Sequence, residues 1–158
     1  MADLLVKLYD LPEDLPRECP PFRLHRPLAP ERRTVVKWVD ENFGERWASE
    51  VELAFSGHPI QCFVALDKGS DLVGFACYDT SFRGFFGPVG VSESCRGKGV
   101  GTALMALALD AMADMGYAYA VIGYSGVDDY YEKTVGAVPI TDSNPGPYRN
   151  WIRRGDRE

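Results

Sequence analysis

The hydrophobic and polar positions of this chain follow two periods, which predict which segments are helices and which are strands. Apolar side chains recur at helical spacing after Pro30 and again from Trp47, and Gly44 separates the two predicted helices. A longer helix is predicted over residues 100–115, because apolar positions recur three, four and seven residues apart and Gly116 follows as a stop. A short fourth helix is predicted for DDYYEKTV.

Runs rich in β-branched and aromatic residues predict the strands. They are LLVKLYDL, FRLHRPL, IQCFVALD, DLVGFACYD, FFGPVGV, YAYAVIGYS, AVPI and, near the end of the chain, NPGPYRNWI with an aromatic anchor. The order of elements is β-β-α-α-β-β-β-α-β-α-β-β, which differs from a regular βαβ alternation. The pattern therefore predicts an α+β (mixed α/β) fold: a central mixed, mostly antiparallel sheet with helices on both faces.

Length and composition place the chain among ordinary globular proteins. Its 158 residues, 46% of them hydrophobic and 25% charged, fit one domain over residues 1–158. No apolar run approaches the roughly 20 residues of a membrane span. The first residues carry acidic side chains early and lack the apolar core of a signal peptide, so a cytoplasmic protein is expected.

Charge and cysteine usage narrow the classes of function. A net charge of −6 argues against a nucleic-acid-binding surface. The four cysteines form no C-x-x-C pair, and Cys62 and Cys77 lie in strand-like runs, which favours reduced core thiols over a zinc site or a disulfide framework. His25 and His58 are isolated, so no metal site is expected.

The stretch SESCRGKGVGTAL, residues 92–104, carries the clearest chemical signal. Gly97, Gly99 and Gly101 alternate immediately before the long helix, and each glycine can adopt positive φ at little cost, so that successive amides point into one concavity. The helix N-terminus adds its positive dipole end, and Arg96 and Lys98 add cationic donors. This combination fits a di- or triphosphate group.

Two familiar phosphate-binding loops are excluded by spacing. The pattern G-x-G-x-x-G fails from Gly97, because residue 102 is Thr, and from Gly99, because residue 104 is Leu. A P-loop would need Gly at Ser92 and Ser or Thr at Gly99. A simple strand-to-helix turn with incidental charges is the structural alternative.

Two segments resemble the GNAT acyltransferase superfamily. VGVSESCRGKGVGTAL matches its V-x-V-x-x-x-x-R-G-x-G-x-G/A motif, and DDYYEKTVGAVPI resembles its Y-E-K-x-G-F junction. The likeness covers about residues 85–140 and is greatest to poorly characterised bacterial-type members. It implies a GNAT-like fold, acetyl-CoA as co-substrate, a strand ending in PVGV that splays from its neighbour to pair with pantetheine, and amides of residues 96–101 around the pyrophosphate. The implied CoA-binding residues are Val89, Gly90, Val91, Arg96, Gly97, Lys98, Gly99, Val100, Gly101 and Thr102.

The resemblance also implies roles in catalysis. Tyr131 occupies the family's general-acid position and would protonate the departing CoA sulfur, while the N–H near Val91 would bind the thioester carbonyl. The chain departs from the family at Tyr124, where Asn is frequent, and its strand before the glycine loop has no carboxylate. Asp79, Glu52 or water then remain as the base.

Other features of the sequence bear on the acceptor. Trp38, Phe43 and Trp47 lie on the two early helices that cover the acceptor site in this family, and acceptor choice is expected within residues 38–56 and the tail 142–151. Tyr130 is expected to pack or to line the acceptor pocket. Cys95 lies near a helix N-terminus, which leaves an acyl-cysteine intermediate as an alternative to direct transfer.

The sequence as a whole predicts an acetyl-CoA-dependent N-acetyltransferase. The acetyl (acyl) group would pass by direct attack to a primary amine of an unidentified acceptor, whether a small amine, an amino acid or a protein. The alternatives are a non-catalytic acyl-CoA sensor or regulatory module, and a phosphate- or nucleotide-binding protein of another kind. No nucleic-acid or membrane partner is expected, and a homodimer is possible by the family's habit.

Overall fold

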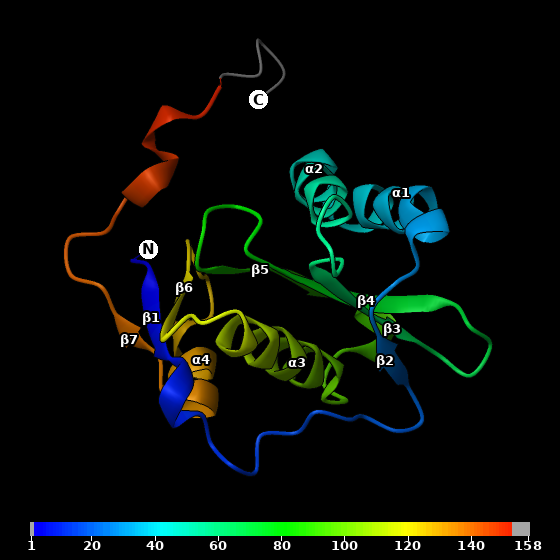
Figure 1. The fold of residues 1–158 in the computed structure, drawn as a ribbon, viewed down its shortest axis with the longest axis horizontal. Helices are drawn as coiled ribbons and strands as arrows, with labels where there is room; N and C mark the ends of the chain where they lie inside the picture. Colours follow the sequence, from blue (N-terminus) through cyan, green and yellow to red (C-terminus); the bar gives the residue numbers. More distant parts are fainter. Residues whose placement is uncertain (1, 153–158) are drawn as a thin grey trace.

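The computed structural model describes residues 2–152, and the strands in that range form one sheet with helices on both faces (Figure 1). The sheet order is β2-β3-β4-β5-β6-β1-β7. The strands are β1 (Leu4–Lys7), β2 (Arg23–His25), β3 (Cys62–Leu66), β4 (Leu72–Tyr78), β5 (Phe85–Val91), β6 (Tyr119–Ile122) and β7 (Val138–Pro139). The α-helices are α1 (Arg32–Phe43), α2 (Glu45–Ala54), α3 (Val100–Asp114) and α4 (Asp128–Val135). The predicted α+β fold is confirmed.

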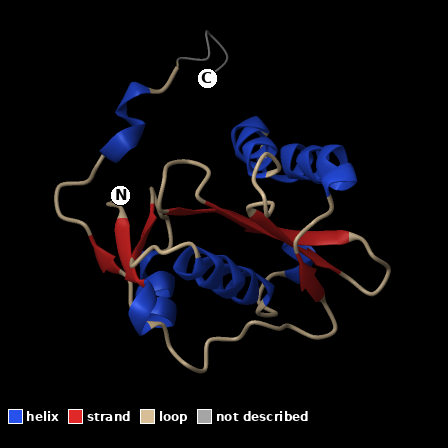
Figure 2. Ribbon diagram, viewed as in Figure 1, coloured by secondary structure: helices blue, strands red, loops and turns tan. Residues whose placement is uncertain are grey.

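Helices cover both faces of the sheet (Figure 2), and each face carries its own hydrophobic cluster. On one face Val35, Val39 and Val51 of α1 and α2 cluster with side chains of β3 and β4 that include Phe75. On the other face α3 and α4 pack against the sheet. The segment between β1 and β2 crosses the outside of α3, where Arg17 pairs with Asp110 at 2.6 Å. Because α3 is covered on two sides, it is buried on more of its surface than one amphipathic stripe predicts.

Most predicted elements are present, and one is wrong. The break between α1 and α2 is at Gly44, whose φ of 98° is a conformation that favours glycine. The tail segment predicted as a final strand is instead a 3₁₀ helix over Gly146–Asn150. The proline at each side of Gly146 cannot donate to a strand ladder, and Gly146 has a φ of 65°, so this segment turns rather than extends.

The central feature for function is the separation of β5 from β6. These two parallel strands pair only at Phe85 with Val121 and at Phe86 with Ile122. Next along β5, the register against β4 shifts, so that Gly87 and Pro88 lie opposite the single residue Cys77. Such a bulge bends the strand. The remaining part of β5 therefore leaves β6 and opens a gap in the sheet, as the resemblance implied.

Gly90 of β5 lies under the aromatic cluster of α1 and α2. A Cβ built on Gly90 would come within 2.6–2.9 Å of three ring atoms of Phe43. The Phe43 ring is itself held between neighbours, with ring centroids 5.2 Å from Trp47 and 5.6 Å from Phe75. The ring has little room to withdraw.

Gly90→Ala is expected to destabilise the fold by about 1–3 kcal/mol, the usual cost of overpacking a filled core. Chemical denaturation measures the change in the free energy of unfolding. The double variant Gly90→Ala/Phe43→Leu is the control, because leucine removes the ring that the new Cβ would meet. The double variant should therefore lose less stability than the sum of the losses in the two single variants. Equal stability of wild type and Gly90→Ala would contradict this account of the packing.

Candidate functional site

The glycine loop leads directly into the N-terminus of α3. Gly97 and Gly99 both have positive φ, 77° and 90°, and Gly99 is the residue that caps the helix. The first helical hydrogen bond runs from the Ala103 amide to the Gly99 carbonyl at 3.1 Å. The amides of residues 100–102 precede that bond, so they have no carbonyl to bind within the helix. Arg96 and Lys98 are exposed beside them.

The unpaired half of β5 presents backbone groups to the gap. The Ser92 amide donates to the Val73 carbonyl of the neighbouring strand at 2.8 Å, so by the alternation of an antiparallel ladder Gly90 also faces β4. Val89 and Val91 then direct their N–H and C=O groups away from β4. In agreement, the Val91 carbonyl accepts a hydrogen bond from Arg96 Nε at 3.2 Å on that side.

Two contacts fix the loop to the rest of the fold. The Cys19 thiol donates to the Lys98 carbonyl at 3.1 Å. Thr102 in the first turn of α3 shares a hydrogen bond of 2.5 Å with the Tyr130 hydroxyl of α4. Tyr130 therefore supports the loop and does not line the acceptor pocket. The Cys95 thiol is partly buried with Ser94 Oγ at 3.8 Å, and no histidine in residues 2–152 is hydrogen-bonded to it.

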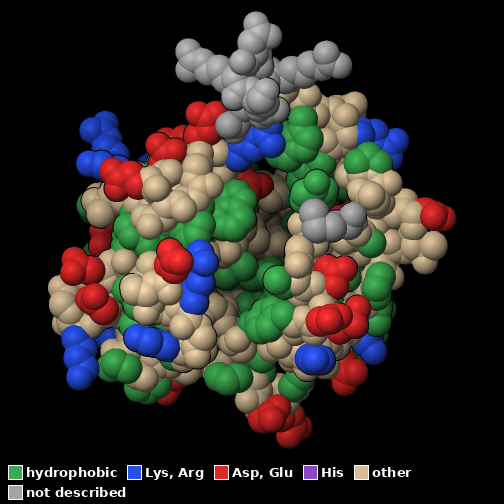
Figure 3. Space-filling model, turned by 180° about the vertical axis from the view of Figure 1, so that it is seen from behind, with side chains coloured by type: hydrophobic (Ala, Val, Ile, Leu, Met, Phe, Trp, Pro, Cys, Tyr) green, Lys and Arg blue, Asp and Glu red, His purple; other side chains and the backbone are tan. Residues whose placement is uncertain are grey.

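A cavity of about 1060 Å³ opens beside the gap between β5 and β6. Figure 3 shows a hollow with hydrophobic side chains gathered around it, between the α2 side of the molecule and the C-terminal segment. Val89 from the unpaired half of β5 and Tyr131 from α4 both line the cavity. The other lining side chains used below are Trp47, Glu50, Ser81, Tyr124, Tyr148 and Trp151.

Tyr131 brings a buried phenol hydroxyl to this cavity. Its side chain is 7% exposed, and burial, with a smaller contribution from Tyr130, raises its pKa to about 12. The phenol is therefore protonated throughout the neutral range and can act only as a hydrogen-bond or proton donor there. This is the protonation state that the role inferred from the sequence requires.

Glu50, Ser81 and Tyr148 form a second polar cluster in the cavity lining, which the sequence did not predict. The Ser81 hydroxyl donates to Glu50 Oε1. Burial raises the pKa of the Glu50 carboxyl, against the opposing effect of the Ser81 bond. Burial and the nearby carboxylates of Glu50 and Asp3 raise the pKa of Tyr148 to about 12. Nothing in the local sequence distinguishes Glu50 from a solvated helical glutamate, so no sequence signal could have found it.

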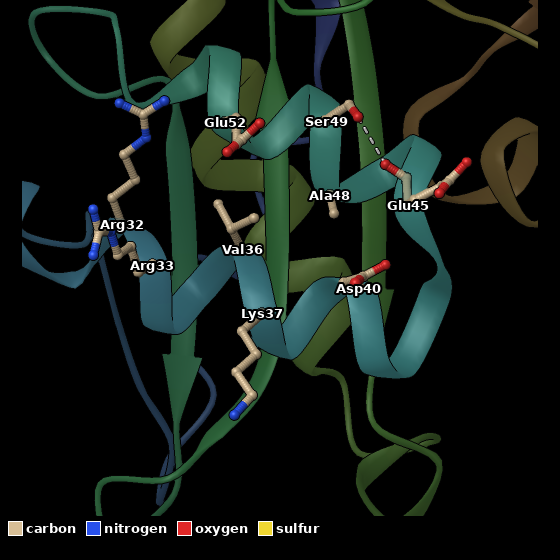
Figure 4. A pocket seen from close by; sticks show the side chains of 9 residues that line it. All are labelled: Arg32, Arg33, Val36, Lys37, Asp40, Glu45, Ala48, Ser49 and Glu52. Carbon is tan, nitrogen blue, oxygen red and sulfur yellow. Dashed lines mark hydrogen bonds between the residues drawn. The ribbon is translucent and has the colours of Figure 1, made fainter.

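The two acids named as candidate bases from the sequence lie elsewhere. Asp79 accepts hydrogen bonds from the Tyr117 hydroxyl at 2.6 Å and the Gly84 amide at 2.7 Å, so it holds the turn before β5. Glu52 lies in a separate charged groove between α1 and α2, where Val36 and Ala48 point into the space between the helices (Figure 4). Neither side chain lines the cavity that contains Tyr131.

The early aromatics divide between the cavity and the core. Trp47 lines the cavity, whereas Trp38 and Phe43 pack over Phe75 in the core beneath it. Of the three, only Trp47 lines the cavity, so its part in binding an acceptor stays a prediction.

The C-terminal segment closes the cavity on the other side. Tyr148 and Trp151 stack with ring centroids 5.5 Å apart, and the Arg46 guanidinium lies 4.3 Å above the Trp151 ring. Asp3 fixes this end of the fold, because its backbone amide donates to Ser143 Oγ and its carboxylate accepts from the Tyr124 amide. The tail therefore lines the cavity, although its predicted strand is wrong, and its part in acceptor choice stays a prediction.

Tyr124 replaces the asparagine common in the family, and its backbone explains that preference. It has a φ of 54°, in the left-handed region that asparagine adopts more readily than other side chains. Its ring packs edge-on against Tyr148 with centroids 6.1 Å apart. The substitution therefore adds an aromatic wall to the cavity.

Within residues 2–152 no group of three or more His, Cys, Asp or Glu side chains is arranged to hold a metal ion. Over the same described range, no helix is both long and apolar enough to pass through a membrane.

The comparison with sequence families gives one match over most of the chain. The model of the acetyltransferase (GNAT) family matches residues 17–137, a range that includes the glycine loop, the unpaired half of β5 and Tyr131. No curated protein matches the chain.

Several solved structures share the fold. A GCN5-related N-acetyltransferase from Sphaerobacter thermophilus has a TM-score of 0.69 at 19% identity, over 88% of this chain and 48% of its own. A GCN5-related glucosamine N-acetyltransferase region of a fungal multi-domain GH3 β-N-acetylglucosaminidase has a TM-score of 0.68 at 18% identity, over 88% of this chain and 19% of its own. A GNAT family acetyltransferase from Brucella melitensis, in complex with acetyl-CoA, has a TM-score of 0.54 at 16% identity, over 71% of this chain and 80% of its own. The chain therefore spans half or less of the length of the first two.

Proposed function

The chain belongs to the GNAT acetyltransferase family, and on that premise we propose that it transfers an acetyl group from acetyl-CoA to a primary amine by direct attack. The observation that carries the proposal is the continuity of the site. The unpaired half of β5 runs from the glycine loop into the cavity that contains Tyr131, so a cofactor extended along β5 would deliver its thioester there.

The glycine loop is the proposed site of the CoA pyrophosphate. Its support is the set of free amides at residues 100–102, the dipole of a 15-residue helix, and the exposed cations Arg96 and Lys98. The N–H and C=O groups of Val89 and the N–H of Val91 would pair with the pantetheine amides, as an added strand would. Gly90 would contribute through the absence of a side chain rather than through a contact, because its polar groups face β4.

Tyr131 is the proposed general acid. The amine nitrogen attacks the acetyl carbonyl carbon, and the tetrahedral oxyanion accepts a hydrogen bond from the β5 backbone. As this intermediate collapses, the C–S bond breaks and the sulfur receives a proton from the Tyr131 hydroxyl. The nitrogen of the attacking amine loses one proton, and water carries this proton to the Tyr131 phenolate, which becomes a phenol again. The supporting evidence is the burial of Tyr131 in the cavity and its raised pKa.

A ligand comparison followed by a turnover assay tests this function. CoA at about 100 times its Kd should stabilise the protein by about 2.7 kcal/mol, which raises Tm by roughly 5–10 °C for a domain of this size. ATP and NAD at the same concentration should have much smaller effects. Free thiol release from acetyl-CoA in the presence of amine pools then measures turnover. Stabilisation by ATP or NAD alone would contradict the CoA assignment, and CoA binding without thiol release for any amine would favour a non-catalytic acyl-CoA sensor.

A further inference from the structure

We propose that the acceptor is a primary amine on an apolar body, and that Glu50 binds its ammonium group and takes its proton. The proposal rests on the proposed function, because it names the acceptor class of the same cavity. It starts from two parts of the cavity lining. One part is Tyr131 with the unpaired half of β5, and the other is the Glu50 carboxylate, hydrogen-bonded by Ser81, in a cavity also lined by aromatic rings.

The position of Glu50 suits a group that receives a cation. It lies on α2, half-buried, and its side chain lines the cavity. Ser81 donates one hydrogen bond to Oε1. An ionised carboxylate has about four lone-pair sites, so this one bond fixes the carboxylate and leaves capacity for an ammonium donor. An incoming ammonium would also offset the cost of keeping the carboxylate charged in a buried place.

The groups around Glu50 come from every element packed against it. From α2 itself, Glu45 and Arg46 line the same cavity, and Arg46 is stacked on Trp151. From β4, the Cys77 thiol lies close enough for Glu50 to act on it. Burial, the neighbouring Cys62 and, least, Glu50 raise the pKa of this thiol. The remaining titratable groups are Tyr148 from the tail, with Asp3 acting on it, and Tyr131 from α4. Apart from Arg46, these groups are neutral or acidic at neutral pH, so the site favours a cationic acceptor.

Apolar and aromatic side chains make up much of the remaining lining, with Ser49 and Ser125 as further polar side chains, and they restrict the body of the acceptor. Trp47, Tyr124, Tyr148 and Trp151 line the same cavity as Glu50, together with Phe86, Pro88 and Ile122. Aromatic faces attract an ammonium and pack against an apolar body. A carboxylate on the acceptor would be repelled by Glu50, while Arg46 is stacked on Trp151. Sugar hydroxyls would exchange water for a lining in which apolar and aromatic side chains outnumber the serines. An amine without other polar groups meets neither penalty.

The proton can be followed through the step. Glu50 removes one proton from R–NH₃⁺, which frees the nitrogen lone pair to attack the acetyl carbon. C–N bond formation and C–S bond cleavage give R–NH–CO–CH₃ and CoA–SH. The net release of one proton occurs when Glu50 ionises again in solvent contact.

The acceptor class is tested with matched amines. 2-Phenylethylamine and phenylalanine differ only in the carboxylate, and glucosamine offers an amine on a hydroxylated body. We expect kcat/KM for 2-phenylethylamine, and for hexylamine, to exceed the values for phenylalanine and glucosamine by at least about 100-fold. CoA binding, measured separately by calorimetry, distinguishes the two failures. Equal or better turnover of phenylalanine or glucosamine, or CoA binding with no turnover of the two apolar amines, overturns the acceptor class; loss of CoA binding overturns the proposed function instead.

The role of Glu50 is tested by the pH profile of Glu50→Gln, with Glu52→Gln as the matched control on the same helix. Wild type and Glu52→Gln should reach a plateau in kcat/KM in the neutral range. Glu50→Gln should be at least about 50-fold slower at pH 7, and its rate should keep rising with pH as the fraction of free amine in solution increases. An unchanged profile in Glu50→Gln would overturn the assignment.

A stability measurement keeps this variant interpretable. Because the folded protein raises the pKa of Glu50, the contribution of its carboxyl to stability is present below the usual glutamate pKa and is lost as pH rises through the raised value. Glutamine retains an oxygen for the Ser81 bond and carries no charge. The Tm of Glu50→Gln should therefore equal or exceed that of wild type at pH 7–8, and the difference should disappear near pH 4. A large loss of Tm at pH 7 would show that Glu50 supports the fold rather than the acceptor.

Discussion

Replacing Gly101 by valine is expected to weaken CoA binding by at least about 100-fold, or about 2.7 kcal/mol. Gly101 is the second residue of α3, within the set of free amides, and a Cβ at this position would lie 3.4 Å from Val91 Cγ2. The branched side chain of valine would fill the space between α3 and β5 that the proposed CoA path crosses. Isothermal titration calorimetry with CoA measures the change.

The matched control is Gly101→Ala. Alanine adds only the Cβ, at an ordinary van der Waals distance from Val91, and the family motif accepts alanine at this position. It should retain CoA binding within about tenfold, and so should Lys98→Ala, since most donors of the loop are amides. Gly99→Val is less informative, because Gly99 has a φ of 90° and valine would strain the backbone whatever the ligand. A Gly101→Val protein that folds and binds CoA as wild type does would remove the loop from the CoA site.

Tyr131→Phe is expected to lower kcat by about 10²-fold while the affinity for acetyl-CoA stays within about threefold. General acid catalysis is worth typically 10²–10⁴-fold, and the lost interaction belongs to the transition state rather than to the bound cofactor. The ring remains in the core, so Tm should change little. Because the pKa of Tyr131 is raised to about 12, any loss of rate between pH 8 and 10 in wild type should not come from this phenol.

The control for this variant is Tyr124→Phe and not the adjacent tyrosine. Tyr124 lines the same cavity but is 56% exposed, so removal of its hydroxyl should leave kcat nearly unchanged. Tyr130→Phe would remove the hydrogen bond to Thr102 at the first turn of α3 and should weaken CoA binding modestly. Full turnover by Tyr131→Phe, on an acceptor for which chemistry limits the rate, would pass the acid role to water or to another group.

The parts of the fold that were predictable depend on local signals. The break at Gly44, the glycine loop and the helix behind it follow from the conformational freedom of glycine and from apolar periodicity. The position of β1 between β6 and β7 depends on pairing between residues more than 100 positions apart, which no local pattern contains. The tail shows a second limit: its aromatic residues suggested a strand, whereas the turn-forming residues around Gly146 decided its conformation.

The candidate site divides in the same way. The CoA-loop residues and Tyr131 are contiguous motifs, so the sequence predicts them as a group. The acceptor end is assembled from α2, the loop after β4 and the C-terminal segment, whose separation in sequence hides their proximity. Asp79, Glu52 and Glu50 are all carboxylic acids in the sequence, and only the fold places the first at a turn, the second in an outer groove and the third in the cavity.

The most direct test of the central claim, that this site joins acetyl-CoA to an amine, is a stoichiometric assay with acetyl-CoA and 2-phenylethylamine. Free thiol is measured by absorbance and the N-acetylated amine by mass spectrometry in the same reaction. The account predicts one amide formed for each thiol released, with both products reduced together about 10²-fold in Tyr131→Phe. Thiol release without amide, or tight binding of CoA with neither product for any primary amine, would contradict it.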